Sequence, residues 1–191
     1  ILELGEWVLR EACTQAKLWQ DMGWKQIVMA VNISAVQLQR VDMVALVSSV
    51  LRETGLEARF LELEITERVI MGDSAELIDT LEALRTLGVR LALDDFGTGY
   101  SSLSYLKSFP FDVLKIDRSF VQGISSSEDD LAITEAVIAL GRSMKLEVLA
   151  EGVETPEHVR ILLEKGCTHM QGYNFSRSLR PAALDKWLKP D

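Results

Sequence analysis

The sequence predicts an α/β fold in which successive βα units build a parallel sheet or barrel. Short apolar runs alternate with longer helical patterns along the whole chain, and the helical patterns begin and end at typical cap residues. In addition, 191 residues with 48% hydrophobic content suit one domain with a single core better than two domains. Six runs are predicted to be strands: 27–34, 60–66, 89–95, 113–117, 146–151 and 169–173.

A helix is predicted after the second strand. It begins at Asp73, and Glu76 lies three residues further on, so that side-chain oxygens can accept hydrogen bonds from free backbone N–H groups. Gly88 stands where a left-handed residue ends a helix. The apolar stripe of this helix is Leu77, Leu81, Leu84 and Leu87.

Two later helices have equally clear ends. One opens with Ser127 and Asp130, and the other has Thr155 as N-cap, Pro156 in its first turn and Gly166 beyond its end. The apolar side of the first of these helices is predicted to be Ile133, Val137, Ile138 and Leu140.

The composition excludes several classes of protein. A formal charge of −9 argues against a protein that grips long nucleic acid through a basic face. No apolar stretch reaches the roughly 18 residues of a membrane span. Cys13 and Cys167 are far apart and outside any CxxC spacing, so we expect buried, reduced thiols and a cytoplasmic domain.

Each predicted strand ends in a group that can bind metal or move a proton. In a parallel barrel these groups converge on the C-terminal rim, where barrel enzymes place their active sites. Taken singly, each is equally well explained as a helix cap or a solvated loop residue. The groups are Asn32, Glu64, Asp94 with Asp95, Lys115 with Asp117, Glu151 and Gln171.

Several carboxylates on one rim repel each other unless a cation is present. The candidate metal ligands are carboxylates and the Asn32 amide, with no His or Cys among them, and such an oxygen-rich set of ligands suits Mg²⁺ or Mn²⁺. Two ions are expected, with the adjacent Asp94 and Asp95 as a bridge. Such a pair of ions can catalyse hydrolysis of a phosphodiester. Lys115 is then expected either to orient the attacking water or offset charge on the phosphorane, or to form a structural ion pair with Asp117 or another rim carboxylate.

The segment 97–102 after Asp95 is expected to be a mobile loop that closes over the rim, with glycines as hinges. It is not a dinucleotide-binding turn, because GTGYSS lacks the third glycine of that fingerprint. His158, in a first helical turn, and His169, in a strand, are interpreted as structural.

Six strings taken together resemble the EAL family of bacterial cyclic-di-GMP phosphodiesterases. The resemblance runs from about residue 2 to 188, in the family's order and spacing. It implies an incomplete TIM-like barrel, with six of eight βα units present and the first strands missing. It also implies hydrolysis of cyclic di-GMP to linear pGpG with two Mg²⁺ or Mn²⁺ ions. The strings are VNIS (31–34), LEITE (63–67), DDFGTGYSSL (94–103), LKID (114–117), AEGVE (150–154) and QGYNFSR (171–177).

The resemblance also implies a role for individual residues. Lys115 matches the lysine near the attacking water, and with Asp95 and Glu151 it is assigned to catalysis. Glu67 matches the glutamate that anchors the loop after Asp95. The implied metal ligands are Asn32, Glu64, Asp94, Asp95 and Glu151. The implied substrate-binding residues are Asp117, Glu154, Gln171 and Phe175.

Two departures from the family pattern stand out. Ser178 replaces a proline, which affects the detail of guanine contacts. The stretch 1–191 is expected to be an EAL domain lacking the N-terminal strand that carries the Glu-Ala-Leu signature and, nearby, an arginine that contacts phosphate. Because that glutamate is absent, a catalytically silent cyclic-di-GMP receptor or an interaction module is the alternative, although neither needs the retained metal set. The resemblance further implies a homodimer, an upstream sensory or GGDEF-type domain, and a parent protein that can be membrane-anchored.

Overall fold

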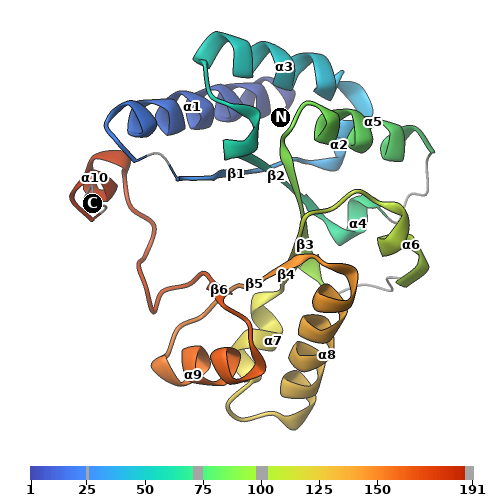
Figure 1. The fold of residues 1–191 in the computed structure, drawn as a ribbon, viewed down its shortest axis with the longest axis vertical. Helices are drawn as coiled ribbons and strands as arrows, with labels where there is room; N and C mark the ends of the chain where they lie inside the picture. Colours follow the sequence, from blue (N-terminus) through green and yellow to red (C-terminus); the bar gives the residue numbers. More distant parts are fainter. Residues whose placement is uncertain (25, 71–74, 98–102, 188–191) are drawn as a thin grey trace. The chain divides into compact units, whose positions relative to one another are not determined.

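The computed structural model describes residues 1–24, 26–70, 75–97 and 103–187, which form alternating helices and strands (Figure 1). The described strands follow chain order across one sheet, and every described pairing is parallel. This arrangement confirms the predicted fold class, an incomplete TIM-like (β/α) barrel with six βα units. The strands are β1 (Met29–Asn32), β2 (Leu61–Thr66), β3 (Arg90–Phe96), β4 (Val113–Ile116), β5 (Glu147–Ala150) and β6 (His169–Met170).

The chain divides into two compact units. The first comprises Ile1–Ile65, Gly72–Leu91 and Leu179–Asp191, and the second comprises Thr66–Met71 and Ala92–Ser178. Helices of the first unit are α1 (Leu2–Asp21), α2 (Ala35–Arg40), α3 (Met43–Thr54), α5 (Ala75–Thr86) and α10 (Pro181–Trp187), with a 3-10 turn at Ala58–Phe60. Helices of the second unit are α4 (Glu67–Ile70), α6 (Leu103–Ser108), α7 (Arg118–Gly123), α8 (Glu128–Met144) and α9 (Pro156–Lys165).

In the first unit, α1 packs against β1 and α3, and fully buried side chains such as Leu9 and Val47 fill the contact. Helix α2 begins with a capping box, in which Ser34 accepts a hydrogen bond from the Gln37 backbone and Gln37 reaches back to the Ser34 backbone. Cys13 is buried, as expected, and burial raises the pKa of its thiol to about 11.

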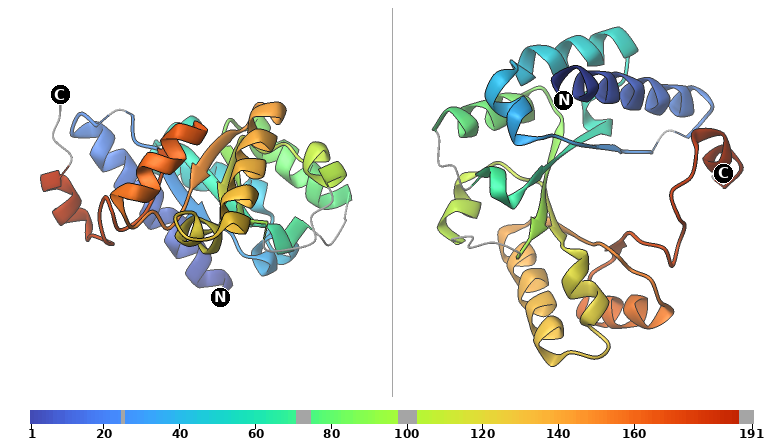
Figure 2. Two further views of the ribbon diagram at one scale, coloured as in Figure 1. Left: turned by 90° about the horizontal axis from the view of Figure 1, so that it is seen from below. Right: turned by 180° about the vertical axis from the view of Figure 1, so that it is seen from behind.

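In the second unit, α8 lies along β4 and β5 and packs against α7 (Figure 2). The predicted caps are confirmed: the Ser127 side chain accepts from the Asp130 N–H, and the Thr155 side chain accepts from the His158 N–H. Gly166 ends α9 with a left-handed φ of 80°. His158 is buried in the first turn of α9, and His169 lies in β6.

Some details of the predicted helices were wrong. On α8, Val137 and Ile138 are buried as predicted, but Ile133 is exposed and the buried side also includes residues three or four positions from these two. Leu87 is also exposed, one residue before the left-handed Gly88. The predicted N-cap Asp73 and the loop residues 98–102 lie outside the described residues. No helix in the described part of the chain is long and apolar enough to span a membrane. The buried residues of α8 are Thr134, Val137, Ile138 and Gly141.

Candidate metal centre

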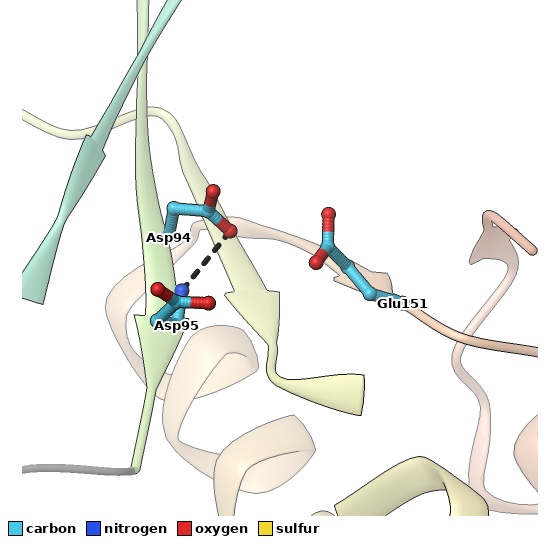
Figure 3. Close-up of side chains that lie close together, drawn as sticks. All are labelled: Asp94, Asp95 and Glu151. Carbon is cyan, nitrogen blue, oxygen red and sulfur yellow. Dashed lines mark hydrogen bonds between the residues drawn. The ribbon is translucent and has the colours of Figure 1, made fainter. Parts of the chain in front are cut away.

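Strand β3 is irregular at the two adjacent aspartates. Neighbouring residues of a regular strand point to opposite faces, so Asp94 and Asp95 would normally diverge. Here the pairing of β3 with β4 shifts register between Leu93 and Phe96, and Asp95 adopts a left-handed φ of 56°. One carboxylate oxygen of each of Asp94, Asp95 and Glu151 lies within 4.8 Å of the other two. Figure 3 shows these three side chains close together.

Glu151 reaches this cluster from the end of β5. Its backbone N–H donates to the Ile116 carbonyl at 3.1 Å, which extends the β4–β5 pairing by one step. Gly152 follows with a left-handed φ of 68°, so the chain turns immediately after the carboxylate. The three carboxylates form an oxygen-only donor set, and such a set fits a hard divalent cation such as Mg²⁺ or Mn²⁺.

Lys115 supplies a cation to the cluster from inside β4. Its side chain is buried, and its Nζ lies 3.2 Å from Asp94 Oδ1 and 2.6 Å from Glu151 Oε1. Lys115 therefore forms an ion pair with rim carboxylates, which was one of the two alternatives left open by the sequence. The same position places its ammonium group beside two proposed metal ligands, so the contact also suits a lysine that orients a reactant.

The pKa values of Asp95 and Asp117 are shifted in opposite directions. Burial raises the pKa of Asp95, and the charge of Asp94 and a hydrogen bond with Asp117 raise it further. Burial also acts to raise the pKa of Asp117, but hydrogen bonds from Ser119 outweigh it and the pKa is lowered. Asp117 is the N-cap of α7, where its side chain accepts the Ser119 N–H at 2.8 Å. The two carboxyls therefore differ in the direction of their pKa shifts, with Asp95 the one whose ionised form is disfavoured.

Glu67 lies at the start of α4 and is almost completely buried. Its Oε2 accepts the N–H of Gly97 at 3.0 Å, and Gly97 has a left-handed φ of 98°. The carboxylate thus holds the turn that follows Asp95, which is the place where the sequence expected Glu67 to act.

Asn32 and Glu64 form a second group of predicted ligands, in the first unit. The two residues are direct partners in the parallel β1–β2 register. Asn32 Nδ2 donates to Glu64 Oε2 at 2.9 Å, and Glu64 is buried while Asn32 is exposed. The structure therefore brings these two predicted ligands together within their own unit.

The predicted substrate-binding residues have diverse contacts. Glu154 is exposed, and its Oε1 accepts from Gln122 Nε2 at 3.1 Å. Gln171 acts here through its backbone, since its N–H donates to Ala150 and its carbonyl accepts from Val153. Phe175 is 45% exposed.

Two contacts near these residues escaped the sequence analysis. The first is the hydrogen bond between Gln122 and Glu154 described above, which joins residues 32 positions apart and has no local signal. The second is the exposed ring of Tyr173, over which the Arg177 guanidinium lies at 4.9 Å from the centroid. The aromatic and basic residues of QGYNFSR were the available sign of this second contact.

Comparisons with known proteins show the family to which the chain belongs. A family model described as EAL domain matches residues 1–178. The cyclic di-GMP phosphodiesterase NbdA of Pseudomonas aeruginosa is 46% identical over 187 residues, which are 98% of this chain and 24% of that protein. A solved complex of the PaMucR phosphodiesterase with c-di-GMP superposes with a TM-score of 0.93 at 43% identity, covering 96% of this chain and 74% of that one.

A further solved structure contains a metal. The manganese and cyclic-di-GMP complex of Klebsiella pneumoniae BlrP1 has a TM-score of 0.83 at 31% identity, covering 92% of this chain and 44% of that one. The chain spans about a quarter of the length of the first curated relatives it matches.

Proposed function

The chain belongs to the EAL domain family. We propose that it is the phosphodiesterase part of a longer protein and that it hydrolyses cyclic di-GMP to linear pGpG in bacterial second-messenger signalling. One observation carries the proposal: Asp94, Asp95 and Glu151 present carboxylates to a common point, and the buried Lys115 lies against two of them. A catalytically silent receptor needs no such arrangement.

The acidic cluster is assigned to two Mg²⁺ or Mn²⁺ ions, because its donors are all oxygen. Asn32 and Glu64 are assigned as further ligands on the family motifs they occupy, not on geometry. When bound, divalent ions neutralise phosphodiester charge and lower the pKa of water. BlrP1, solved with manganese and cyclic di-GMP, supports the choice of metal.

Lys115 has the most direct role among the residues of the chain itself. Its ammonium group, held at 2.6 Å from Glu151, can donate a hydrogen bond to the attacking water and fix its direction. The water gives up one proton as its oxygen forms a bond to phosphorus, and the bond from phosphorus to the ribose O3′ breaks. The leaving oxygen takes up a proton, and the product carries a 5′-phosphate.

The remaining assignments follow the family motifs. Glu67 anchors the turn after Asp95 through the Gly97 N–H. A homodimer, an upstream sensory or GGDEF-type domain and a cytoplasmic location of this region complete the proposal. The residues assigned to substrate binding are Asp117, Glu154, Gln171 and Phe175.

The test is to incubate the full-length protein with cyclic di-GMP and Mn²⁺ in ¹⁸O-labelled water and to analyse the product by mass spectrometry. The proposal expects linear pGpG with one ¹⁸O on its 5′-phosphate, and no product when EDTA is present. Tight binding of cyclic di-GMP without turnover would favour the receptor alternative instead.

A further inference from the structure

Helix α7 lies against two glycines, Gly97 and Gly152, that closely follow clustered carboxylates, although the helix contributes none of these carboxylates itself. Gly97 stands two residues after Asp95, and Gly152 directly follows Glu151. Both glycines have a left-handed φ, 98° and 68°. All of these residues belong to the second unit.

Each glycine touches a different residue of α7. A Cβ at Gly97 would lie 3.0 Å from Cε2 of Phe120. A Cβ at Gly152 would lie 2.6 Å from Cβ and 3.2 Å from Cα of Arg118, so here the obstacle includes the helix backbone. A third contact is the hydrogen bond from Gln122 to Glu154, in the same loop as Gly152.

Helix α7 is itself well anchored. Asp117 caps its N-terminus, Val121 is fully buried, and the helix packs against α8. A rigid element that touches two loops restrains them relative to each other, because neither loop can shift without displacing the helix.

We infer that α7 is a positioning element that couples the turn after Asp95 to the loop after Glu151 through Phe120 and Arg118. The part of this inference that concerns metal binding rests on the function proposed above. Metal ligands depend on the groups that orient them, and loss of such support typically lowers metal affinity by about 10–100-fold.

The coupling is tested in the full-length, metal-free protein by hydrogen exchange of segments 94–97 and 150–155. Phe120→Leu alters the contact with Gly97 only, and Gly152→Ala alters the contact with Arg118 only. We expect each variant to speed exchange in both segments. An effect confined to the segment next to the substitution would overturn the inference. If Gly152→Ala does not fold, Phe120→Leu decides alone.

Gly55→Ala is the matched control. Gly55 has a φ of 72°, close to that of Gly152, but the nearest atom to its Cβ position is Lys17 Cε at 3.7 Å. The substitution therefore introduces the same backbone strain without a clash. It is expected to leave exchange in both segments unchanged.

Titration with Mn²⁺ alone provides the second measurement. We expect the Kd for Mn²⁺ to rise by about 10–100-fold in Gly152→Ala and to stay within about twofold in Gly55→Ala. Equal affinity in the two variants would contradict a positioning role in metal binding. Failure of the wild-type protein to bind Mn²⁺ would instead contradict the proposed function, while hydrogen exchange would still decide whether α7 couples the loops.

Discussion

At the scale of single residues, Asp95 combines two unfavourable features. Its backbone is left-handed, a conformation that is unfavourable for residues other than Gly, although Asp and Asn tolerate it better than most. In addition, the negative charge of Asp94 lies close to its carboxylate. Burial and these neighbours raise the pKa of Asp95, so the fold favours the protonated side chain. This contribution to stability is present below the unfolded pKa and is lost as the pH rises through the folded pKa. At neutral pH the ionised Asp95 side chain therefore destabilises the folded metal-free protein, and a bound cation would offset this effect.

The variant Asp95→Asn tests this trade-off. We expect the melting temperature of the metal-free protein at pH 7 to rise by about 2 °C, since 1 kcal/mol corresponds to about 2–4 °C in a domain of this size. We also expect the additional stabilisation by Mn²⁺ to be lost. The check is thermal melting with and without Mn²⁺ at pH 4 and pH 7, where the gain should be smaller at pH 4. A lower melting temperature at pH 7 would contradict the account.

The environment of Lys115 predicts how much this residue contributes to the free energy of unfolding. The side chain is buried between Asp94 and Glu151, so Lys115→Met leaves carboxylates without their cation. We expect a loss of about 3–5 kcal/mol in the free energy of unfolding of the metal-free protein, measured by urea denaturation. Turnover should also fall, because no ammonium group remains to orient water.

Lys165→Met is the control for this loss. Lys165 Nζ lies 2.6 Å from Glu135 Oε1, a distance like that in the Lys115 pair, but both side chains are exposed. We expect a change below about 1 kcal/mol. If the two variants lose the same stability, burial of the Lys115 cluster is not what makes its charge important.

At the scale of elements, the contact between α4 and the turn after β3 can be tested at Glu67. Glu67→Ala removes the acceptor of the Gly97 N–H and should weaken Mn²⁺ binding by about 10–100-fold. Glu67→Gln keeps a side-chain oxygen and should retain most of the affinity. Isothermal titration with Mn²⁺ measures both. Equal affinities of the Ala variant and wild type would show that the turn needs no anchor.

Element ends were predictable where their cause is local. The caps at Ser127 and Thr155 are formed by side chains that reach backbone groups three residues away, so the sequence alone reveals them. The irregularity of β3 is different. Nothing in the letters of 89–95 marks the shifted register at Asp94 and Asp95, because it depends on the pairing with β4.

Strand β6 illustrates a boundary that the sequence analysis missed. A strand was predicted over 169–173, but it ends at Met170. After Gln171, a turn forms in which Phe175 and Ser176 donate to the Gly172 carbonyl, and Asn174 donates to Val153. These tertiary contacts compete with strand pairing and are absent from any local pattern.

At the scale of the whole molecule, the order of βα units followed from the alternation of apolar runs and helical patterns. The acidic cluster followed from the rule that parallel strands bring their carboxyl ends to one rim. An ion pair of Lys115 with a rim carboxylate was one predicted alternative, but the sequence did not single out Glu151, which lies 36 positions further along the chain. Contacts of that range depend on strand order and register, which only the folded chain determines.

The central claim is that the cluster of Asp94, Asp95 and Glu151 holds divalent metal needed to hydrolyse cyclic di-GMP. The most direct measurement is the rate of pGpG formation by the full-length protein as a function of Mn²⁺ concentration, for wild type and Asp94→Asn. The account predicts no turnover after chelation, recovery with Mn²⁺, and at least about 100-fold slower turnover in the folded Asp94→Asn variant at the same Mn²⁺ concentration. Turnover that survives chelation, or an Asp94→Asn rate within a few fold of wild type, would contradict it.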